Sequence, residues 1–578
     1  MSNDLGIDRS GNGNNFTVNN LAYSDQMVDS PSNNFCTMNP LTHGSAATYE
    51  QGNLRIETPN YPWSRGTFAV SSGKWYWEWT HHDGSYPTYT GICNDSRVPA
   101  GENHGVANTQ AWYGNTDGLL KDWNSSSWVN RTDLAIDDII GIAVDLDNGS
   151  IKWYKNNTLV YTDSSLPAGE EITAMIAGTN DGTSGSGWGD ITFNFGQDSS
   201  FATFKTAQGN QDGNDIGDFY YTPPTGFLAL CTKNLPEPAV VPSEHFNPVL
   251  YTGTGNAQSV TGVGFQPDFV WAKKRSEAGW HHLFDAVRGA GKVLYSNATD
   301  SEDTSAQSLT SFNADGFSLG TAGGLGGDSP PINGVAWNWK ANGSGSSNTD
   351  GSINTTKTSA NVNAGFSIVS YTGNGSANQT VGHGLSQDID MVIVKNRTSG
   401  SNDNWRVWHT GLSGNTYYVG LNQTSAQDTS STVFNGHSAT TFTVGNDGSV
   451  NRNTDTYIAY CFHSVDGYSK VGSYTGNGNA DGIFVYTGFR PAFTLIKKSS
   501  ASGSWWEMVD NKRSPTNVMS KTLYANQSDA EYNSTSYNRD FTSNGFKIRN
   551  TNAGDNTSGA TYIYIAFAET PFKYSNAR

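Results

Sequence analysis

The chain has 578 residues, of which 15% are charged and 12% aromatic, and its formal net charge is −18 at pH 7. Its 65 glycines and 17 tryptophans are typical of a turn-rich β protein with several cores, which excludes a globally disordered chain. A chain this acidic, without a basic stripe interleaved with aromatic residues, is repelled by phosphate backbones, so we expect no nucleic-acid partner.

Residues 1–34 are rich in Asn, Gly, Ser and Asp, with isolated apolar residues such as Phe16 and Val18. This composition predicts an extended arm, which either lies on a neighbouring subunit or forms the first strand of the next domain. The start of the chain has no positively charged region followed by an apolar stretch, and no run of about 18 apolar residues occurs anywhere. We therefore expect synthesis without a secretory signal, and no membrane insertion.

Residues 35–205 alternate apolar and polar side chains, as half-buried strands do. The clearest strand is Gly73-Lys-Trp-Tyr-Trp-Glu-Trp79. A second strand, Ile139–Leu146, passes through the hairpin turn Asp147-Asn-Gly149 into Ser150–Lys155. The region is therefore predicted to be a β-sandwich.

The order of the segments within this region resembles that of a SPRY domain. The segments that carry the resemblance are Gly73–Glu78, Gly91-Ile92, Trp112-Tyr113, the hairpin Gly141–Asn156 and the terminal Phe193-Asn-Phe-Gly196. The resemblance implies a concanavalin-like β-sandwich that serves as a binding module. Its loops at one end would grip a protein or ligand, without catalysis.

Proline-rich residues 206–243 predict a stiff linker that contains one short strand. The chain after it repeats a short motif three times, as Tyr251-Thr-Gly-Thr-Gly255, Tyr371-Thr-Gly-Asn-Gly375 and Tyr474-Thr-Gly-Asn-Gly478. The tyrosines are 120 and 103 residues apart, which is the size of a domain rather than of a solenoid repeat. Each unit should therefore own a core.

Further landmarks follow each motif in the same order. An apolar run ends in Lys, a Trp-containing strand follows, and an aromatic strand closes the unit. The apolar runs are Gly264–Lys273, Gly384–Lys395 and Gly488–Lys497, and the closing strands are Val335–Lys340, Tyr457–Phe462 and Tyr562–Phe567. We predict three tandem homologous β-sandwich domains, called here repeat 1 (244–343), repeat 2 (344–465) and repeat 3 (466–578). A Gly/Ser/Asn-rich junction predicts a flexible joint between repeats 1 and 2, whereas the short junction between repeats 2 and 3 predicts rigid packing.

The combined layout resembles the virion-surface proteins of tailed bacteriophages. The shared features are the opening Asn33–Leu41, the SPRY-like domain, the segment Pro223–Pro236 and the Tyr-Thr-Gly-Asn-Gly repeats. The resemblance implies a structural or adhesive component at the virion surface, made in the host cytoplasm, whose partners are other virion proteins. It also implies a homo-oligomer, with a trimer favoured, which would cover exposed β edges.

Catalytic arrangements are not indicated. Glycoside hydrolysis needs two carboxylates about 5 to 9.5 Å apart, but Glu78 stands alone in its strand, and Glu507 and Asp510 are three apart and face opposite sides. The stretch Gly316-Phe-Ser-Leu-Gly320 matches a nucleophile motif, yet the glycine-rich residues after it cannot form the helix which that motif requires, so we read it as a strand. We expect no catalytic residues.

No metal or cofactor site is predicted either. The acidic turn at Asp145 and Asp147 could begin a calcium loop, but no acidic ligand closes the loop of about twelve residues, and a hairpin explains these residues. His281 and His282 are adjacent on a strand and therefore point apart. The four cysteines contain no C-x-x-C pair and are predicted to be buried small hydrophobic residues: Cys36, Cys93, Cys231 and Cys461.

The tryptophans of the repeats are the candidate ligand or interface residues. They are Trp280, Trp405, Trp408, Trp505 and Trp506. Neighbouring residues on a strand face opposite sides, so one of Trp505 and Trp506 should lie outside the repeat's core. An exposed Trp marks a glycan site or a subunit interface, whereas burial between sheets or subunits remains the structural alternative.

These observations predict an all-β, non-enzymatic virion protein. The first hypothesis is a tail fibre or receptor-binding adhesin, which contacts host surface glycans or proteins through its loops. The second is a capsid decoration protein that coats the head. The third is a depolymerase of surface polysaccharide.

Overall fold

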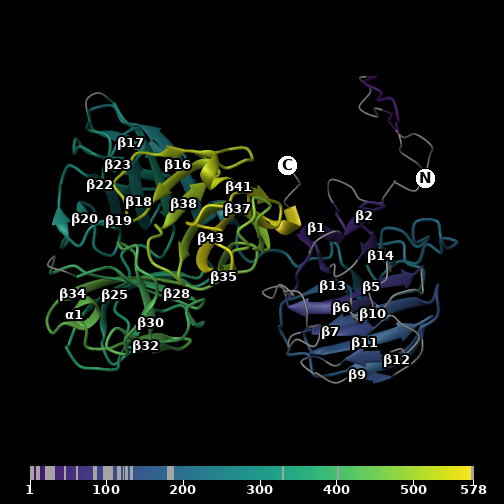
Figure 1. Ribbon diagram of the computed structural model, residues 1–578. Helices are drawn as coiled ribbons and strands as arrows, with labels where there is room; N and C mark the ends of the chain where they lie inside the picture. Colours follow the sequence, from purple (N-terminus) through teal and green to yellow (C-terminus); the bar gives the residue numbers. More distant parts are fainter. Residues whose placement is uncertain are drawn as a thin grey trace. The chain divides into compact units, whose positions relative to one another are not determined.

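The computed structural model describes residues 6–7, 13–19, 33–43, 47–59, 63–82, 88–94, 109–113, 119–121, 123, 128–130, 134–178, 188–328, 331–399 and 403–574 (Figure 1). The described residues are almost entirely β-structure, as predicted, with one four-residue α-helix, α1 (Gly448–Asn451), and the 3-10 turns η2 (Pro242–Glu244), η3 (Thr535–Tyr537) and η4 (Phe572–Tyr574). The chain divides into two compact units, Met1–Pro236 and Glu237–Arg578. The arm predicted over 1–34 falls mostly outside the described residues.

The first unit contains two large sheets, which form a β-sandwich, as predicted. One sheet has the order β1 (Met38–His43), β4 (Trp63–Gly66), β13 (Ile172–Gly178), β6 (Thr88–Asn94), β7 (Thr109–Tyr113), β8 (Leu119–Lys121) and β9 (Trp128–Asn130). The other has the order β12 (Thr158–Asp163), β11 (Ser150–Lys155), β10 (Ile139–Asp145), β5 (Lys74–His81), β14 (Trp188–Asn194), β3 (Arg55–Pro59) and β2 (Thr48–Glu50).

Strand β5 is buried on both faces. Trp75, Trp77 and Trp79 alternate with Tyr76 and Glu78, and all five side chains are inaccessible to solvent. Because successive side chains of a strand point to opposite faces, both faces of β5 must be covered. The far face is covered by part of the segment predicted to be a linker.

This covering segment lies within residues 206–236. Phe219, Phe227 and Cys231 pack against Tyr76, and β15 (Leu228–Ala229) pairs with β5 in parallel. The Glu78 carboxylate accepts hydrogen bonds from the backbone N–H groups of Tyr220 and Tyr221, both at 2.8 Å. Burial raises the pKa of Glu78 to about 7. Residues 210–231 therefore belong to the core of the first unit.

The carboxylates of the acidic turn between β10 and β11 bind neighbouring groups of the protein. The carboxylate of Asp145 accepts from the backbone N–H and the side-chain amide of Asn148 and pairs with Lys74 at 2.8 Å. Asp147 accepts from the backbone N–H of Gly73, and Gly149 has a φ of 65°. These contacts occupy the carboxylates that a calcium loop would have offered.

The second unit contains the three repeats, which share one strand order, with an additional edge strand, β25, in repeat 2. Each repeat has a main sheet and a three-stranded small sheet, both antiparallel. In repeat 1 the main sheet has the order β16 (Phe246–Thr252), β24 (Asn333–Trp339), β18 (Phe269–Lys274), β19 (His281–Asp285), β20 (Lys292–Tyr295) and β21 (Asp303–Thr304). In repeat 2 the order is β25 (Thr355–Asn361), β26 (Phe366–Thr372), β34 (Thr456–Phe462), β28 (Met391–Asn396), β29 (Arg406–His409), β30 (Tyr417–Gly420) and β31 (Asp428–Thr429). In repeat 3 it is β35 (Ser469–Thr475), β43 (Thr561–Pro571), β37 (Phe489–Lys498), β38 (Glu507–Asp510), β39 (Lys521–Tyr524) and β40 (Tyr532–Asn533).

The small sheets are equally regular. They run β17 (Gln258–Thr261), β23 (Gly316–Leu319), β22 (Leu309–Asn313); β27 (Gln379–Gly382), β33 (Thr441–Val444), β32 (Phe434–His437); and β36 (Phe484–Tyr486), β42 (Gly545–Ile548), β41 (Arg539–Thr542). The stretch Gly316–Gly320 is thus largely strand β23, where Ser318 pairs with Ser259, as the strand interpretation predicts.

Each main sheet separates two cores. One face packs against the repeat's own small sheet; in repeat 1 this local core joins Val270 and Ala272 of β18 to Phe317 of β23. The other face, with Phe269 and Trp271, joins a single core to which all three repeats contribute. Two-sided burial explains why the apolar runs are continuous rather than alternating.

The shared core closes the repeats into a ring. Phe269 stacks on Tyr460 of repeat 2 with ring centroids 4.3 Å apart, and Phe246 stacks on Phe567 of repeat 3 at 4.8 Å. Phe462 of repeat 2 meets the same Phe567 at 6.1 Å. Each repeat therefore contacts both others, and Figure 1 shows them side by side in teal, green and yellow.

Candidate functional site

The repeated Tyr-Thr-Gly-x-Gly motif has a structural role. The Tyr371 and Tyr474 hydroxyls donate to the backbone carbonyls of Val450 and Asp555, both at 2.7 Å, on the loop that precedes the closing strand. A Cβ on the first glycine of the repeat-2 motif, Gly373, would lie 2.3 Å from a carbonyl oxygen. The second glycines have φ of 74°, 72° and 69°. In repeats 2 and 3 the motif therefore holds the segment before the closing strand, and in all three repeats its second glycine takes a positive φ that other residues rarely adopt.

The structure fixes the register between the Trp strands. The backbone N–H of His281, of Trp405 and of Trp506 each donates to the side chain of an equivalent asparagine: Asn297, Asn422 and Asn526. These three residues therefore occupy one position of the repeat. The position before it holds Trp280, Asn404 and Trp505. Trp280 is therefore equivalent to Trp505 and not to Trp405.

Two of the candidate tryptophans lie between repeats. The Trp405 indole donates to the carbonyl of Tyr295 in repeat 1 at 3.0 Å, and the Trp506 indole donates to the carbonyl of Gly420 in repeat 2 at 2.9 Å. Both side chains are fully buried in the shared core. His281 takes this position in repeat 1, where its Nδ1 accepts from the Trp271 indole at 2.9 Å. In repeats 2 and 3 the side chain at this position therefore binds the neighbouring repeat.

Trp408 lies elsewhere. It is buried within the local core of repeat 2, where its ring lies 4.3 Å from that of His437. It contacts neither of the other tryptophan positions in the described hydrogen bonds and ring contacts.

Trp280 and Trp505 lie at the surface. Trp280 is 47% exposed and packs edge-on against Tyr295, with centroids 4.6 Å apart. Trp505 is half-buried and packs on the equivalent tyrosine, Tyr524, at 4.7 Å. In repeat 2 the same two positions hold Asn404 and Gly420. The aromatic pair is therefore an addition to the shared fold and not a requirement of it.

Repeat 3 extends its pair into a larger cluster. Tyr532 and Tyr537 pack on Tyr524 with centroids 5.4 and 5.8 Å away. Tyr532 is 37% exposed, whereas Tyr524 beneath it is buried. We call Trp505, Tyr524, Tyr532 and Tyr537 the Trp505 platform. It is the largest surface aromatic cluster that the contacts of the described residues define in the second unit.

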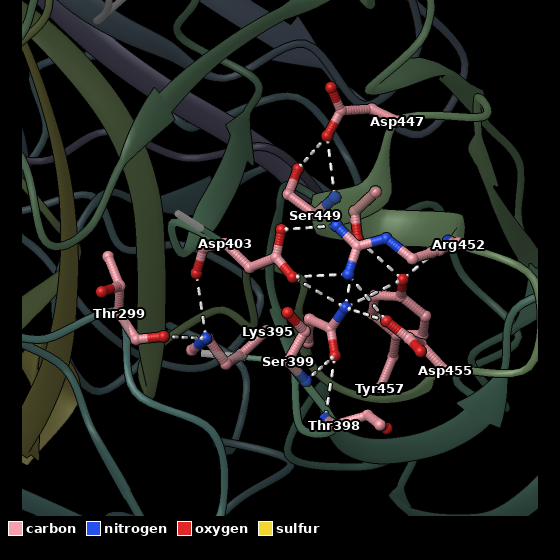
Figure 2. A network of polar contacts seen from close by, with 12 residues as sticks. Thr299, Lys395, Thr398, Ser399, Asp403, Asp447, Ser449, Arg452, Asp455 and Tyr457 are labelled. Atoms are coloured by element: carbon pink, nitrogen blue, oxygen red, sulfur yellow. Dashed lines mark hydrogen bonds and ion pairs between the residues drawn. The ribbon is translucent and has the colours of Figure 1, made fainter. Parts of the chain in front are cut away.

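Two of the lysines that end the apolar runs lie at junctions between repeats. Figure 2 shows Lys395, whose Nζ donates to the backbone carbonyls of Thr299 in repeat 1 and Asp403, both at 2.9 Å. Lys497 makes the equivalent bonds to Thr424 of repeat 2 and to Ser504. Burial lowers the pKa of Lys273, Lys395 and Lys497 to about 8. The ammonium groups of Lys395 and Lys497 thus each bind backbone carbonyls of two neighbouring repeats.

The network in Figure 2 continues from Lys395 into the loop of repeat 2. Arg452 pairs with Asp403 at 3.1 Å and with Asp455 at 3.0 Å, and its backbone N–H donates to the Tyr457 hydroxyl at 2.7 Å. Arg452 is partly exposed, and both carboxylates are bound to it. The network therefore holds the loop and offers no unpaired carboxylate for catalysis.

The three junctions between repeats, called here the seams, differ in their charged residues. Arg397 of repeat 2 pairs with Glu302 of repeat 1, and Arg275 of repeat 1 pairs with Glu531 of repeat 3, both at 2.8 Å. The equivalent contact between repeats 2 and 3 is a backbone hydrogen bond from Gln427 to Ser499. Two seams thus carry an Arg–Glu pair at this position and the third does not.

Repeat 3 contains a buried cluster of two carboxylates and one arginine. Arg539 donates to Glu507 at 2.6 Å and to Asp555 at 3.2 Å, and none of the three side chains is more than 1% exposed. Burial and the neighbouring Asp555 raise the pKa of Glu507 above its usual value, with Arg539 opposing the shift. Because the cluster is sealed, it is a structural core element rather than a catalytic pair.

Residues 241–571 match the model of a protein family described as a domain of unknown function (DUF7483). The chain belongs to this family. The match begins beside η2 and ends at the last residue of β43, so the DUF7483 domain is the whole ring of three repeats and not a single repeat.

Two solved SPRY domains are similar to part of the chain. The SPRY domain of human HERC1 shares 14% identity with a TM-score of 0.22, over 27% of this chain and 96% of that chain. The PSpry domain of TRIM65 shares 14% identity with a TM-score of 0.23, over 28% and 89%. At these values neither match carries an argument about function.

Metal chemistry finds no support among the described residues of the DUF7483 domain or of the first unit. These residues contain no group of three or more His, Cys, Asp or Glu side chains that could hold an ion. His281 and His282 do point apart, and burial lowers the pKa of both. All four cysteines are buried and free. No described helix has the length and apolarity to cross a membrane.

The sequence predicted rigid packing only between repeats 2 and 3, and the flexible joint predicted between repeats 1 and 2 is wrong, because both of these repeats contribute to the shared core. The continuous apolar runs and their terminal lysines were the available signals, because a strand buried on one face only would alternate and would not end in a buried cation.

Proposed function

We propose that this chain is a non-enzymatic structural protein of a tailed-phage virion, and specifically a tail fibre or receptor-binding adhesin. The observation that carries the proposal is the pair of equivalent surface tryptophans on a ring whose other repeated aromatics are buried. Trp280 and Trp505 expose apolar rings at positions where the same fold tolerates Asn404. Exposed aromatic rings without a fold requirement are typical of contact surfaces.

The construction of the ring supports an adhesive role. Three seams share one core, so the surface loops are carried on a stiff base, as binding loops usually are. The carboxylates that could serve hydrolysis in repeat 3, Glu507 and Asp555, are sealed from solvent by burial. The first unit would then serve as a second binding module, directed at the host surface or at other virion proteins.

Location on the particle is the deciding test. Purified virions are labelled with gold-conjugated antibodies to the second unit and imaged by electron microscopy. Label at the tail tip supports the adhesin, and label spread over the head supports the alternative, a capsid decoration protein. Unlabelled virions would reject both.

Assembly and hydrolysis have separate tests. Light scattering after gel filtration measures the oligomer, and we expect a homotrimer. Incubation with host surface polysaccharide should release no new reducing ends, and their appearance would support a depolymerase instead.

A further inference from the structure

We infer that the Trp505 platform binds the pyranose ring of a neutral host-surface glycan, with the Trp280–Tyr295 pair as a second, weaker subsite. This inference rests on the proposed adhesin function and names its ligand class and its residues. It is carried by ring geometry, by the polar rim of the platform and by the comparison among the three repeats.

The platform has the shape of a supported aromatic surface. Tyr524 is the buried base, and Trp505, Tyr532 and Tyr537 pack on it with interplanar angles between 55° and 77°. Since Tyr524 is itself inaccessible, the rings above it are held from below and present their outer atoms to solvent. Such rings are fixed before a ligand arrives, which lowers the entropy cost of binding. The C–H groups of a pyranose ring form an apolar face that can lie on them.

The rim of the platform carries hydroxyl and amide groups. Asn533, Thr535 and Ser536 are exposed beside Tyr532 and Tyr537. Short polar side chains of this kind both donate and accept hydrogen bonds, as the hydroxyl groups of a sugar require.

Charge selects a neutral sugar over an acidic one. The Tyr532 hydroxyl donates to the carboxylate of Asp529 at 3.0 Å, which places a negative charge at the platform. This local charge would repel the carboxylates of a uronic or sialic acid polymer.

The repeats provide an internal comparison. Repeat 1 has the Trp–Tyr pair without the two additional tyrosines, and repeat 2 has Asn404 and Gly420 in its place. The equivalent surfaces therefore carry a large aromatic cluster in repeat 3, a small one in repeat 1 and none in repeat 2. A polymer of repeating sugars can engage the two sites at once, which raises its apparent affinity above that of either site.

The test uses the full-length protein and substitutions that the fold already accepts. Trp505→Asn and Trp280→Asn each install the residue that repeat 2 carries at that position. Tyr574→Ala is the matched control, because Tyr574 is 55% exposed and follows the end of β43 that pairs with Phe489, away from the Lys498 end near Trp505. Circular dichroism confirms that each variant is folded.

Binding is measured by isothermal titration with hexasaccharides of glucose, galactose, mannose and N-acetylglucosamine, and with hexagalacturonate as the acidic probe. We expect at least one neutral hexasaccharide to bind and hexagalacturonate to fail. Trp505→Asn should weaken binding about tenfold, as loss of one aromatic contact predicts, and Trp280→Asn should weaken it less. Tyr574→Ala should bind as the unsubstituted protein does.

Two results would overturn the inference: no neutral hexasaccharide binds, or Trp505→Asn binds as tightly as the unsubstituted protein. Neither result touches the proposed adhesin role, which fails if the antibodies label the head or leave the virions unlabelled. If the antibodies label the tail and no sugar binds, the protein would instead bind a host protein from the same position on the virion.

Discussion

Replacement of Trp506 by Ala tests whether the repeats depend on one another. The indole is 1% exposed in the shared core and donates to Gly420 of the neighbouring repeat. Truncation of a buried Trp to Ala costs about 3 to 5 kcal/mol, and a buried carbonyl left without its donor costs about 1 to 3 kcal/mol more. We therefore expect the free energy of unfolding to fall by at least about 4 kcal/mol.

The adjacent Trp505 is the matched control. It is the same residue type and also lies just before β38, but it is at the surface and makes no described hydrogen bond to another repeat. Trp505→Ala should cost less than Trp506→Ala, because the half-buried ring loses about 0.5 to 1.5 kcal/mol of aromatic pairing and only part of the burial that the core position loses. Urea unfolding, followed by circular dichroism, measures both variants.

The shape of the transition carries further information. Because the core is common to three repeats, the second unit should unfold in one cooperative step in which the midpoint moves and the slope is unchanged. Equal losses for the two tryptophans, or three separate transitions in the unsubstituted protein, would refute the shared-core interpretation.

Three further predictions follow from buried charges. The pKa of Glu507 is raised above its usual value of 4.5, so above pH 4.5 the folded state holds a proton that the unfolded state has lost. The free energy of unfolding should therefore fall as the pH rises above that value. Glu507→Gln should reduce this fall in urea titrations from pH 5 to 8. Lys497 has a pKa lowered from 10.5 to about 8, so stability should rise as the pH increases between these values, less steeply in Lys497→Met; an unchanged slope would contradict its burial. Glu531→Gln should lower the free energy of unfolding by about 2 kcal/mol, because the partly buried Arg275 loses its carboxylate partner. As a control, Asp388→Asn replaces a side chain that is 61% exposed and should change this free energy by no more than about 0.5 kcal/mol.

Much of the fold could be predicted from the sequence, because the repeats report on one another. The three Tyr-Thr-Gly motifs, the Lys-terminated runs and the closing strands lie at equivalent places in three sheets of the same order. The hairpin at Asp147 was predictable too, since its turn needs a residue such as Gly149 with positive φ.

The ring could not be predicted in this way. Periodicity shows that a strand is buried on both faces, but it does not show whether the second face meets a helix, a subunit or another repeat. The indole of Trp405 finds its acceptor 110 residues away, at Tyr295. The same limit applies to residues 206–236, where proline content favours a linker but Phe219 and Phe227 supply the cover for β5.

The register between the tryptophan-containing segments also needed the structure. The sequence shows only that each repeat has such a segment. The hydrogen bonds to Asn297 and Asn422 show that His281, and not Trp280, is equivalent to Trp405.

Closure of the ring inside one polypeptide has a consequence for how this protein can change over time. In an assembly of identical subunits every substitution appears at all positions simultaneously, so a change that suits one junction must suit the rest. Here each copy is encoded separately and can drift alone, as the Arg–Glu pair at two junctions and Gln427 with Ser499 at the third illustrate. A gene of this kind can acquire a new specificity on one copy while the other two preserve the scaffold.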